Sequence, residues 1–183
     1  MAAPTAADVR VGTPLVTGGV WSAVKGTALP ATANVALNAA FAGLGYIDES
    51  GVVQSISADT KDIVAWGGDT VRVIQTSHGV TFKLTMIETN VAATKEYYGQ
   101  ANVTDTAGAL AITVNSSVLT NREYVLEVKD GTRKGRVVIP DGQVTERGDV
   151  TYVHSDAIKY EVTITAYPDA SGNKAYIYWD TAA

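Results

Sequence analysis

Apolar and polar residues alternate in two neighbouring segments, residues 71–76 and residues 80–87. In the second segment every even-numbered residue from 80 to 86 is apolar. A period of two is typical of a β-strand with one buried face, because successive side chains point to opposite sides of a sheet. Ser77-His78-Gly79 joins the segments and predicts a tight turn, so we expect an antiparallel hairpin here.

Similar strand-like segments occur elsewhere, mostly in the second half of the chain. They are separated by turn residues such as Asp130-Gly131, Asp141-Gly142 and the segment 168–173. Short strands with turn chemistry between them predict a mainly β fold, an antiparallel sandwich or barrel. The expected strands are residues 21–25, 52–57, 109–114, 123–128, 135–140, 143–153, 158–166 and 175–179.

Two short helices are expected beside these strands. Asn34 stands at a cap position, apolar residues follow at positions 37, 41 and 44, and Gly45 provides a stop. Asn90 is the cap expected for the second helix, residues 91–98, which Gly99 ends. The fold class is therefore mainly β with one or two short α-helices.

The domain organisation follows from the segments without periodicity. Residues 1–19 are small and rich in Ala, which predicts a flexible arm. Residues 20–183 then form a single β domain, as expected for a chain of 183 residues. Asp48-Glu49-Ser50-Gly51 predicts a turn, and residues 59–69 predict a long loop. Long loops within compact domains are often functional, so residues 48–69 are the candidate functional segment.

The composition narrows the possible chemistry. Val and Thr supply about a quarter of the residues, Cys is absent and His occurs twice. A disulfide framework, a thiolate zinc site and a cysteine nucleophile are therefore excluded. The net charge of −5 disfavours a protein that holds nucleic acid by its phosphates. No apolar segment reaches the length of a membrane span, and the first ten residues do not resemble a secretory signal.

Few residues suggest catalysis. Asp59 with Asp62 and His154 with Asp156 are the pairs that could act as acids and bases, but solvated turns explain both better. Gly131-Thr132-Arg133-Lys134-Gly135 lacks the spacing of a phosphate-binding loop, and a hairpin turn explains it. We therefore expect no catalytic residue, no cofactor and no metal ion, and we expect that the protein is not an enzyme.

Two features could instead serve contacts with other molecules. Trp66, beside two glycines, is either an exposed contact residue or an aromatic that folds back over the core. Lys129, Arg133, Lys134 and Arg136 form the one basic cluster of the sequence. It could contact a phosphate or another subunit, or it could be a solvated hairpin end.

Several ordered segments resemble the major tail proteins of bacteriophages with long, non-contractile tails. The resemblance covers most of residues 18–166. The segments that carry it are Gly26-Thr27-Ala28-Leu29-Pro30, Leu44-Gly45-Tyr46-Ile47-Asp48-Glu49-Ser50-Gly51-Val52, Ala65-Trp66-Gly67-Gly68-Asp69, Ile87-Glu88-Thr89-Asn90, Tyr97-Tyr98-Gly99 and Asn102-Val103-Thr104.

This resemblance implies a structural protein of the virion tail with the phage tail tube fold. Six copies would form a ring, and rings would stack into a tube around a tape-measure protein, ending at tail-tip and terminator proteins. DNA would pass as transient cargo, and no membrane anchor is expected. In this family a long loop and terminal arms join the rings, which corresponds to residues 48–69 and 1–19 here. The candidate assembly contacts are Asp48, Glu49, Asp62, Trp66, Asp69, Arg133 and Lys134.

Two alternatives to this function remain open. A ligand- or carbohydrate-binding β-sandwich is suggested by Tyr176, Tyr178 and Trp179 near the C-terminus. A tube protein of a contractile or secretion machine would share the same fold. The position of a bore is also open, because Arg72 and Lys83 would make a bore on their strand face partly basic, and a basic bore would retain DNA.

Overall fold

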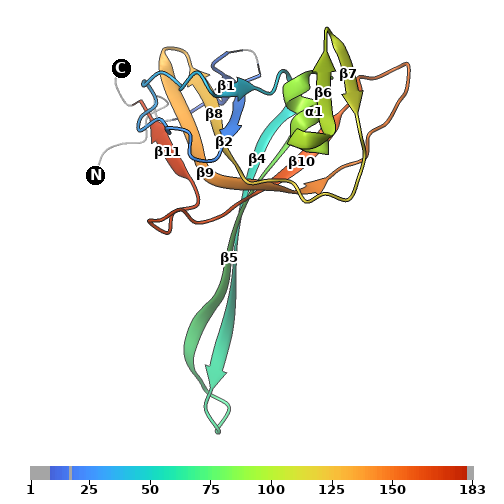
Figure 1. Cartoon of the computed structure of the whole chain (residues 1–183). Helices are drawn as coiled ribbons and strands as arrows, with labels where there is room; N and C mark the ends of the chain where they lie inside the picture. Colours follow the sequence, from blue (N-terminus) through green and yellow to red (C-terminus); the bar gives the residue numbers. More distant parts are fainter. Residues whose placement is uncertain (1–8, 17, 181–183) are drawn as a thin grey trace.

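The computed structural model describes residues 9–16 and 18–180. A β-rich body carries one long hairpin that extends away from it (Figure 1). The strands are β1 (Thr13–Pro14), β2 (Val20–Val24), β3 (Ala42–Gly43), β4 (Ile47–Val64), β5 (Thr70–Met86), β6 (Val103–Thr106), β7 (Ala109–Ile112), β8 (Arg122–Asp130), β9 (Arg133–Arg147), β10 (Tyr160–Ala166) and β11 (Tyr176–Trp179). The helices are α1 (Val91–Tyr98) and the short 3-10 helix η2 (Gln100–Asn102).

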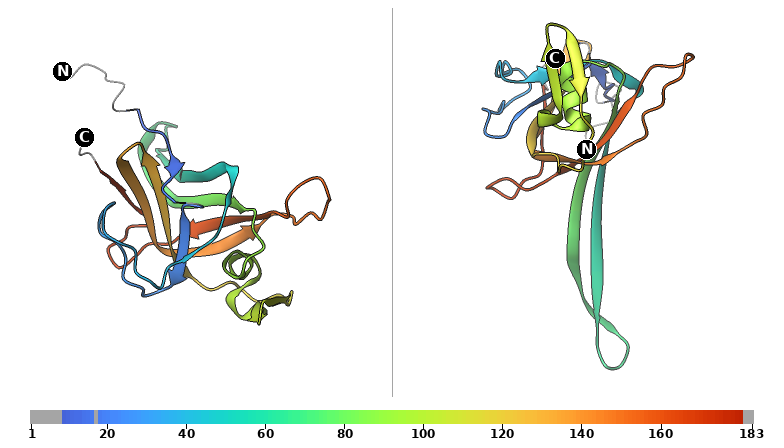
Figure 2. Two further views of the ribbon diagram at one scale, coloured as in Figure 1. Left: turned by 90° about the horizontal axis from the view of Figure 1, so that it is seen from above. Right: turned by 45° about the vertical axis from the view of Figure 1, so that its right-hand side comes forward.

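One antiparallel sheet contains most of these strands, in the order β3-β2-β8-β9-β10-β5-β4. Strand β1 pairs with β8, and β11 pairs with β9. Strands β6 and β7 form a separate hairpin, and Figure 2 shows this hairpin lying beside α1 at one side of the body. The predicted mainly β, antiparallel fold class is confirmed.

The main core lies on one face of the sheet, and a smaller cluster around Val125 and Val138 lies on the other face. Val162 and Ile164 of β10 and Phe82 and Leu84 of β5 are buried, while the residues between them are polar and only partly covered. Strands β10 and β5 are direct neighbours, so the two apolar rows lie side by side. The alternation seen over residues 80–86 and 158–166 is therefore the signature of these two strands.

The hairpin turn predicted at Ser77-His78-Gly79 is wrong. These residues lie inside β5, where Gly79 pairs with Ser57 and His78 pairs with Ala58. The chain reverses at residues 65–69 instead, so the loop expected over residues 59–69 is strand as far as Val64. The two alternating segments belong to one strand, β5, because the polar strand β4 pairs with both of them.

The turn predicted at Asp48-Glu49-Ser50-Gly51 lies within β4. Ile47 pairs with Met86 and the next paired residue, Val52, pairs with Leu84, so these four residues bulge out of the pairing. Asp48 accepts a hydrogen bond from the backbone N–H of Ser50, and Gly51 has a φ of 67°. These turn-forming residues therefore make a bulge that bends β4, and the strand continues beyond the bulge.

The helix expected after Asn34 is also wrong, because this segment is a loop that ends in β3. The guanidinium of Arg136 donates hydrogen bonds to the carbonyls of Thr32 and Val35, at 2.6 and 2.7 Å. Phe41 is buried against a small cluster around Val125 of β8. The Arg136 side chain therefore bonds backbone carbonyl groups that, in a helix, would accept hydrogen bonds from within the segment.

The helix expected over residues 91–98 is confirmed as α1. The Asn90 side chain accepts a hydrogen bond from the N–H of Ala93 at 2.8 Å, and Gly99 ends the helix with a φ of 105°. Ala93 and Glu96 face the sheet and are buried.

The turn predicted at Asp141-Gly142 is wrong as well. Strand β9 continues through it, pairing with β8 and β11 in its first half and with β10 in its second half. Asp141 faces the end of β2, where its carboxylate accepts a hydrogen bond from Lys25 at 2.5 Å and another from Asn121 at 2.6 Å. The two residues mark an irregularity in the pairing, where the register between β8 and β9 shifts.

The arm predicted over residues 1–19 lies partly outside the described residues. In the described part, Thr13 of β1 pairs with Lys129 of β8, and the N–H of Leu15 donates to the carbonyl of Glu127 at 3.1 Å. This segment therefore runs along the edge of β8.

Candidate assembly surface

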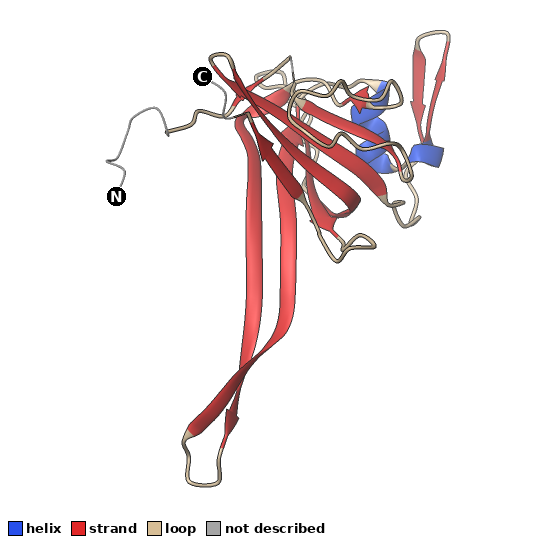
Figure 3. Cartoon of the chain, turned by 90° about the vertical axis from the view of Figure 1, so that its left-hand side faces the viewer, coloured by secondary structure: helices blue, strands red, loops and turns tan. Residues whose placement is uncertain are grey.

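The distal part of the long hairpin contributes nothing to the core. None of residues 53–79 is buried, although β4 and β5 continue through this region (Figure 3). A two-stranded hairpin without other support is marginally stable in water. The large apolar side chains that it leaves exposed are Val53, Ile56, Ile63, Val64, Trp66, Val71 and Val73.

The hairpin tip is a tight turn that presents a single aromatic residue. The N–H of Ala65 donates to the carbonyl of Asp69 at 2.8 Å, and the N–H of Gly68 donates to the carbonyl of Ala65 at 2.9 Å. Gly68 has a φ of 93°, which favours glycine. Trp66 is 106% exposed, so of the two placements considered for it the structure has the exposed one.

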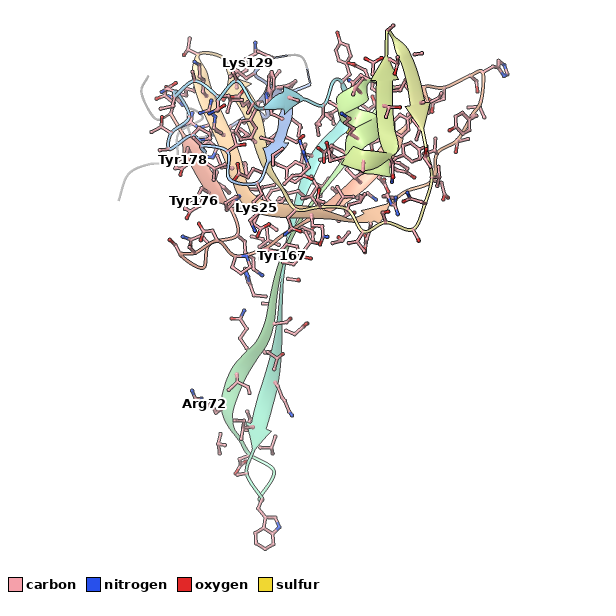
Figure 4. The ribbon with its side chains drawn as sticks, viewed as in Figure 1. Lys25, Arg72, Lys129, Tyr167, Tyr176 and Tyr178 are labelled. Atoms are coloured by element: carbon pink, nitrogen blue, oxygen red, sulfur yellow. The ribbon has the colours of Figure 1, made fainter. Side chains whose placement is uncertain are left out.

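The candidate contact residues lie in three separate places. Asp62, Trp66 and Asp69 are on the distal hairpin, Asp48 and Glu49 are at the start of β4, and Arg133 and Lys134 follow the turn between β8 and β9. Figure 4 shows that Arg72 of the hairpin and Lys129 of β8 lie at opposite ends of the molecule. One copy therefore does not bring the candidates together into a single site.

Asp48 is held in an ion pair. Its carboxylate lies 3.2 Å from Lys159, and the N–H of Ser50 and the Lys159 ammonium together lower the pKa of Asp48. Glu49 is exposed and makes no ion pair with the described residues.

The basic cluster of the sequence is divided by the fold. Arg136 is buried in β9, where it forms an ion pair with Glu127 of β8 in addition to its bonds to the loop carbonyls. Its guanidinium therefore links the loop of residues 32–41 to β8 and β9. Lys129, Arg133 and Lys134 remain at the end of the β8–β9 hairpin.

An apolar groove lies at the body end of β4, and we call it the docking groove. Its volume is about 450 Å³. Its wall combines β1, β8 and the start of β4, which are distant in the sequence, so no local pattern reveals it. The groove is lined chiefly by Gly12, Pro14, Ile47, Val52, Leu126 and Val128, with Asp48 and Glu49 also in its wall.

The pairs considered for catalysis are explained by local contacts. Asp59 accepts a hydrogen bond from Ser77 across the exposed hairpin at 2.6 Å. Asp156 lies 3.2 Å from Lys159. Within residues 9–16 and 18–180, no group of three His, Asp or Glu residues is arranged to hold a metal ion.

The buried carboxylate of Glu96 joins α1 to the sheet. It accepts hydrogen bonds from Ser22 at 2.6 Å and from Tyr124 at 2.9 Å, and it forms an ion pair with Arg122. These partners come from β2 and β8. The arrangement satisfies the carboxylate on several sides, as a structural cross-link requires.

The C-terminal aromatic residues pack on the body. The rings of Tyr176 and Tyr178 are stacked, with centroids 6.3 Å apart, and both contact the small cluster around Val138. Tyr176 also donates a hydrogen bond to Asp169 at 2.5 Å. The aromatic pair suggested as a sugar platform is therefore half-buried and bonded within the chain.

The comparisons with known proteins agree with a structural role. The sequence model of the phage tail tube protein family matches residues 4–182. The chain thus has the features of a structural β-protein. It belongs to the phage tail tube protein family and is a component of the virion tail.

Three solved structures are similar to this chain at low sequence identity. The tube-terminating cap of the anti-feeding prophage has a TM-score of 0.47 at 12% identity, covering 98% of this chain and all of that one. The sheath-tube complex of the extracellular injection system PVC has a TM-score of 0.47 at 9% identity, covering 96% and 98%. Its sheath/tube terminator has a TM-score of 0.44 at 12% identity, covering 92% and 98%. No curated protein matches the sequence.

The described residues contain no helix that is both long enough and apolar enough to cross a membrane.

Proposed function

We propose that six copies of this tail tube protein form a ring, and that rings stack into the tube through which DNA leaves the virion. The observation that carries this proposal is the long hairpin of β4 and β5, which extends from the body without a buried residue between positions 53 and 79. Such a segment gains stability when another protein surface covers it. The hairpin is therefore the inter-ring element, in place of the loop expected over residues 48–69.

The open sheet supports ring formation. Strand β4 is the last strand at one end of the sheet order, and β3 is the last at the other. Unpaired strand edges bind further strands, and a closed ring of copies removes such edges. Obligate interfaces of this kind bury on the order of 2,000 Å² or more.

The polar face of β5 and β10 is the face that we assign to the bore. Lys83 on this face lies 2.9 Å from Glu161 of the neighbouring strand, so its charge is compensated. Thr81, Thr85 and Thr163 are neighbours on the same face. A surface of hydroxyl groups with paired charges does not hold phosphates, so DNA slides along it. The objection to a basic bore therefore no longer applies to Lys83.

The net charge supports the same role. Each copy carries −5, so six copies carry 6 × (−5) = −30 per ring.

We also propose the partners that accompany a tail tube: a tape-measure protein inside it during assembly, and tip and terminator proteins at its ends. We further propose that the arm of residues 1–19 contacts a neighbouring copy, while its residues 13–15 stay bonded to β8 of their own chain.

A shortened hairpin tests the proposal. Ser57 and Gly79 are cross-strand partners, so replacing residues 58–78 by Asn-Gly closes the hairpin with a two-residue turn. The complete chain should form rings and hollow tubes in negative-stain electron microscopy. The shortened chain should keep its thermal unfolding transition and sediment as single copies or isolated rings. Tubes formed equally well by the shortened chain, or single copies of the complete chain at every concentration, would contradict the proposal.

A further inference from the structure

We propose that Trp66 at the hairpin tip of one copy inserts into the docking groove of a second copy. This inference rests on the proposed function, because it requires that copies assemble. It goes further by naming the two surfaces that meet and the side chain at their centre.

Trp66 has the properties of an anchor residue. It is 106% exposed and stands on a turn of two hydrogen bonds, so its backbone is held in place. Aromatic side chains bury about 150–250 Å² each when they are covered, and Trp is enriched among the residues that dominate binding energy. The tip therefore presents a large apolar group in a defined position.

The docking groove has the size and the lining to receive it. Pockets that enclose organic molecules have volumes of about 300–1,000 Å³, and the groove has a volume of about 450 Å³. Ile47, Val52 and Leu126 supply aliphatic surface to its wall. The groove can take the indole of Trp66 together with part of the neighbouring turn.

The tip cannot reach the groove of its own chain. Val52 lines the groove, and the strand runs from there to Val64 next to the tip. At about 3.3 Å per residue, the fourteen residue-to-residue steps from position 52 to position 66 span roughly 45 Å. Figure 3 shows the hairpin running away from the body over this length. A Trp66 side chain that occupies the groove therefore comes from a second copy.

One face of the distal hairpin carries charges opposite to those in the groove wall. Ile63 pairs with Arg72 and Lys61 pairs with Ile74, so Lys61 and Arg72 share one face of the distal hairpin, and Asp62 belongs to the other face. Neither cation forms an ion pair with the described residues, and Glu49 in the groove wall forms none either. With Trp66 inserted, the cationic face can lie against the carboxylates of Glu49 and Asp48.

This contact joins different surfaces of the two copies. Such a heterologous contact repeats from copy to copy along one direction, provided that the rotation between copies does not close it. The hairpin and Lys129, which adjoins Val128 of the groove, lie at opposite ends of the molecule (Figure 4). Repetition of this contact would stack copies along the direction of the hairpin, as the proposed tube requires.

Cysteine cross-linking tests the contact, because the chain contains no cysteine of its own. Gly67 adjoins Trp66, Gly12 lines the groove, and an added Cβ at either position meets no atom within 4 Å. Chains with Gly67→Cys and chains with Gly12→Cys are mixed, assembled and oxidised. We expect a disulfide between the two positions, identified by peptide mass spectrometry. Chains with Ser117→Cys, exposed and outside the groove, serve as the matched partner and should give at least tenfold less cross-link.

Substitution of the anchor gives a second measurement. Trp66→Ala should raise the protein concentration needed for tube formation by about tenfold or more, as expected for a dominant interface residue. Trp66→Phe should restore part of the loss, and Val118→Ala, which removes part of another exposed apolar side chain outside the groove, should change it less than threefold. Thermal unfolding of each single copy should be unchanged.

The outcomes separate the two proposals. If the unmodified chain forms no tubes, the proposed function fails and the docking contact fails with it. If tubes form but Gly67→Cys cross-links to Ser117→Cys as well as to Gly12→Cys, or if Trp66→Ala assembles normally, only the docking contact is overturned. If tubes form and no disulfide joins Gly67→Cys to Gly12→Cys, another segment or molecule fills the groove, and the docking contact is overturned.

Discussion

The Nε atom of Arg122, on β8, lies 2.7 Å from the Oε1 atom of Glu96, on the only α-helix of the described chain. Both side chains are largely buried, with exposed fractions of 11% and 3%. The same carboxylate accepts hydrogen bonds from Ser22 and Tyr124. The helix is thus fixed to two strands through one side chain.

Removing this carboxylate should destabilise the protein strongly. Glu96→Ala leaves the Arg122 guanidinium buried without its partner, which costs about 3–5 kcal/mol in the free energy of unfolding. Urea unfolding followed by circular dichroism measures this change. Lys83→Ala breaks the exposed pair with Glu161 and is the matched control, with an expected loss below about 1 kcal/mol. Equal losses in the two variants would contradict the role of burial.

The loop of residues 32–41 should depend on the shape of the Arg136 side chain. Arg136→Lys keeps the charge but cannot bond Glu127 and the carbonyls of Thr32 and Val35 together, because an ammonium lacks the planar fork. We expect a loss of about 2 kcal/mol in unfolding free energy and faster amide hydrogen exchange in this loop. Arg72→Lys on the exposed hairpin is the control and should change neither quantity. Unchanged amide exchange in Arg136→Lys would show that the Arg136 hydrogen bonds do not hold the loop.

Tyr98 should make the stability sensitive to high pH. Burial, and a hydrogen bond with Tyr152, raise its pKa from 10.0 to about 12. Between these pH values the unfolded chain loses this proton and the folded chain keeps it, so the free energy of unfolding falls as the pH rises. Burial raises the pKa of Tyr97 and Tyr124 in the same direction.

Denaturant unfolding at a series of pH values measures this effect. In Tyr98→Phe the decline in unfolding free energy between pH 10 and pH 12 should be shallower than in the unmodified chain, because one of the protons is no longer involved. Below pH 9 the difference between the two proteins should be constant. Parallel curves throughout the alkaline range would show that Tyr98 does not contribute.

Gly142 should tolerate no side chain. A Cβ at this position would lie 2.8 Å from Cδ2 of Tyr124 and 2.9 Å from Cγ2 of Ile164. Both neighbours are buried, so Gly142→Ala should lower the free energy of unfolding by about 1–3 kcal/mol through overpacking. Gly67→Ala at the open hairpin tip is the control and should stay within about 0.5 kcal/mol. An unchanged melting temperature for Gly142→Ala would mean that the neighbouring side chains shift enough to make room for the added methyl group.

Local patterns predicted the parts of the fold that local forces determine. The helix at residues 91–98 has its own cap and stop, Asn90 and Gly99, and the alternation over residues 80–86 reports a buried face. The turn at Ser77-His78-Gly79 was misplaced because neither face of the distal hairpin is buried. Residues 71–76 alternate although neither face is buried there, so the alternation does not show where the strand ends, and the turn-forming residue types 77–79 suggest a false end.

Long-range contacts account for the remaining differences. The segment after Asn34 carries helix signals, yet Arg136, about a hundred residues away in sequence, binds its carbonyls. The docking groove joins Pro14 to Val52 and Val128, which no sequence window contains together. Trp66 was recognisable as a candidate contact from its glycine neighbours, but its isolation at the end of a hairpin follows only from the pairing of β4 with β5.

The boundary between the buried core and the distal hairpin falls just before Val80. Substitutions beyond this boundary leave the side chains of the buried core in place. Under the proposed docking contact, they act on the joining of copies instead. The same contact would keep two tail proteins with nearly the same body and different hairpins from mixing in one tube.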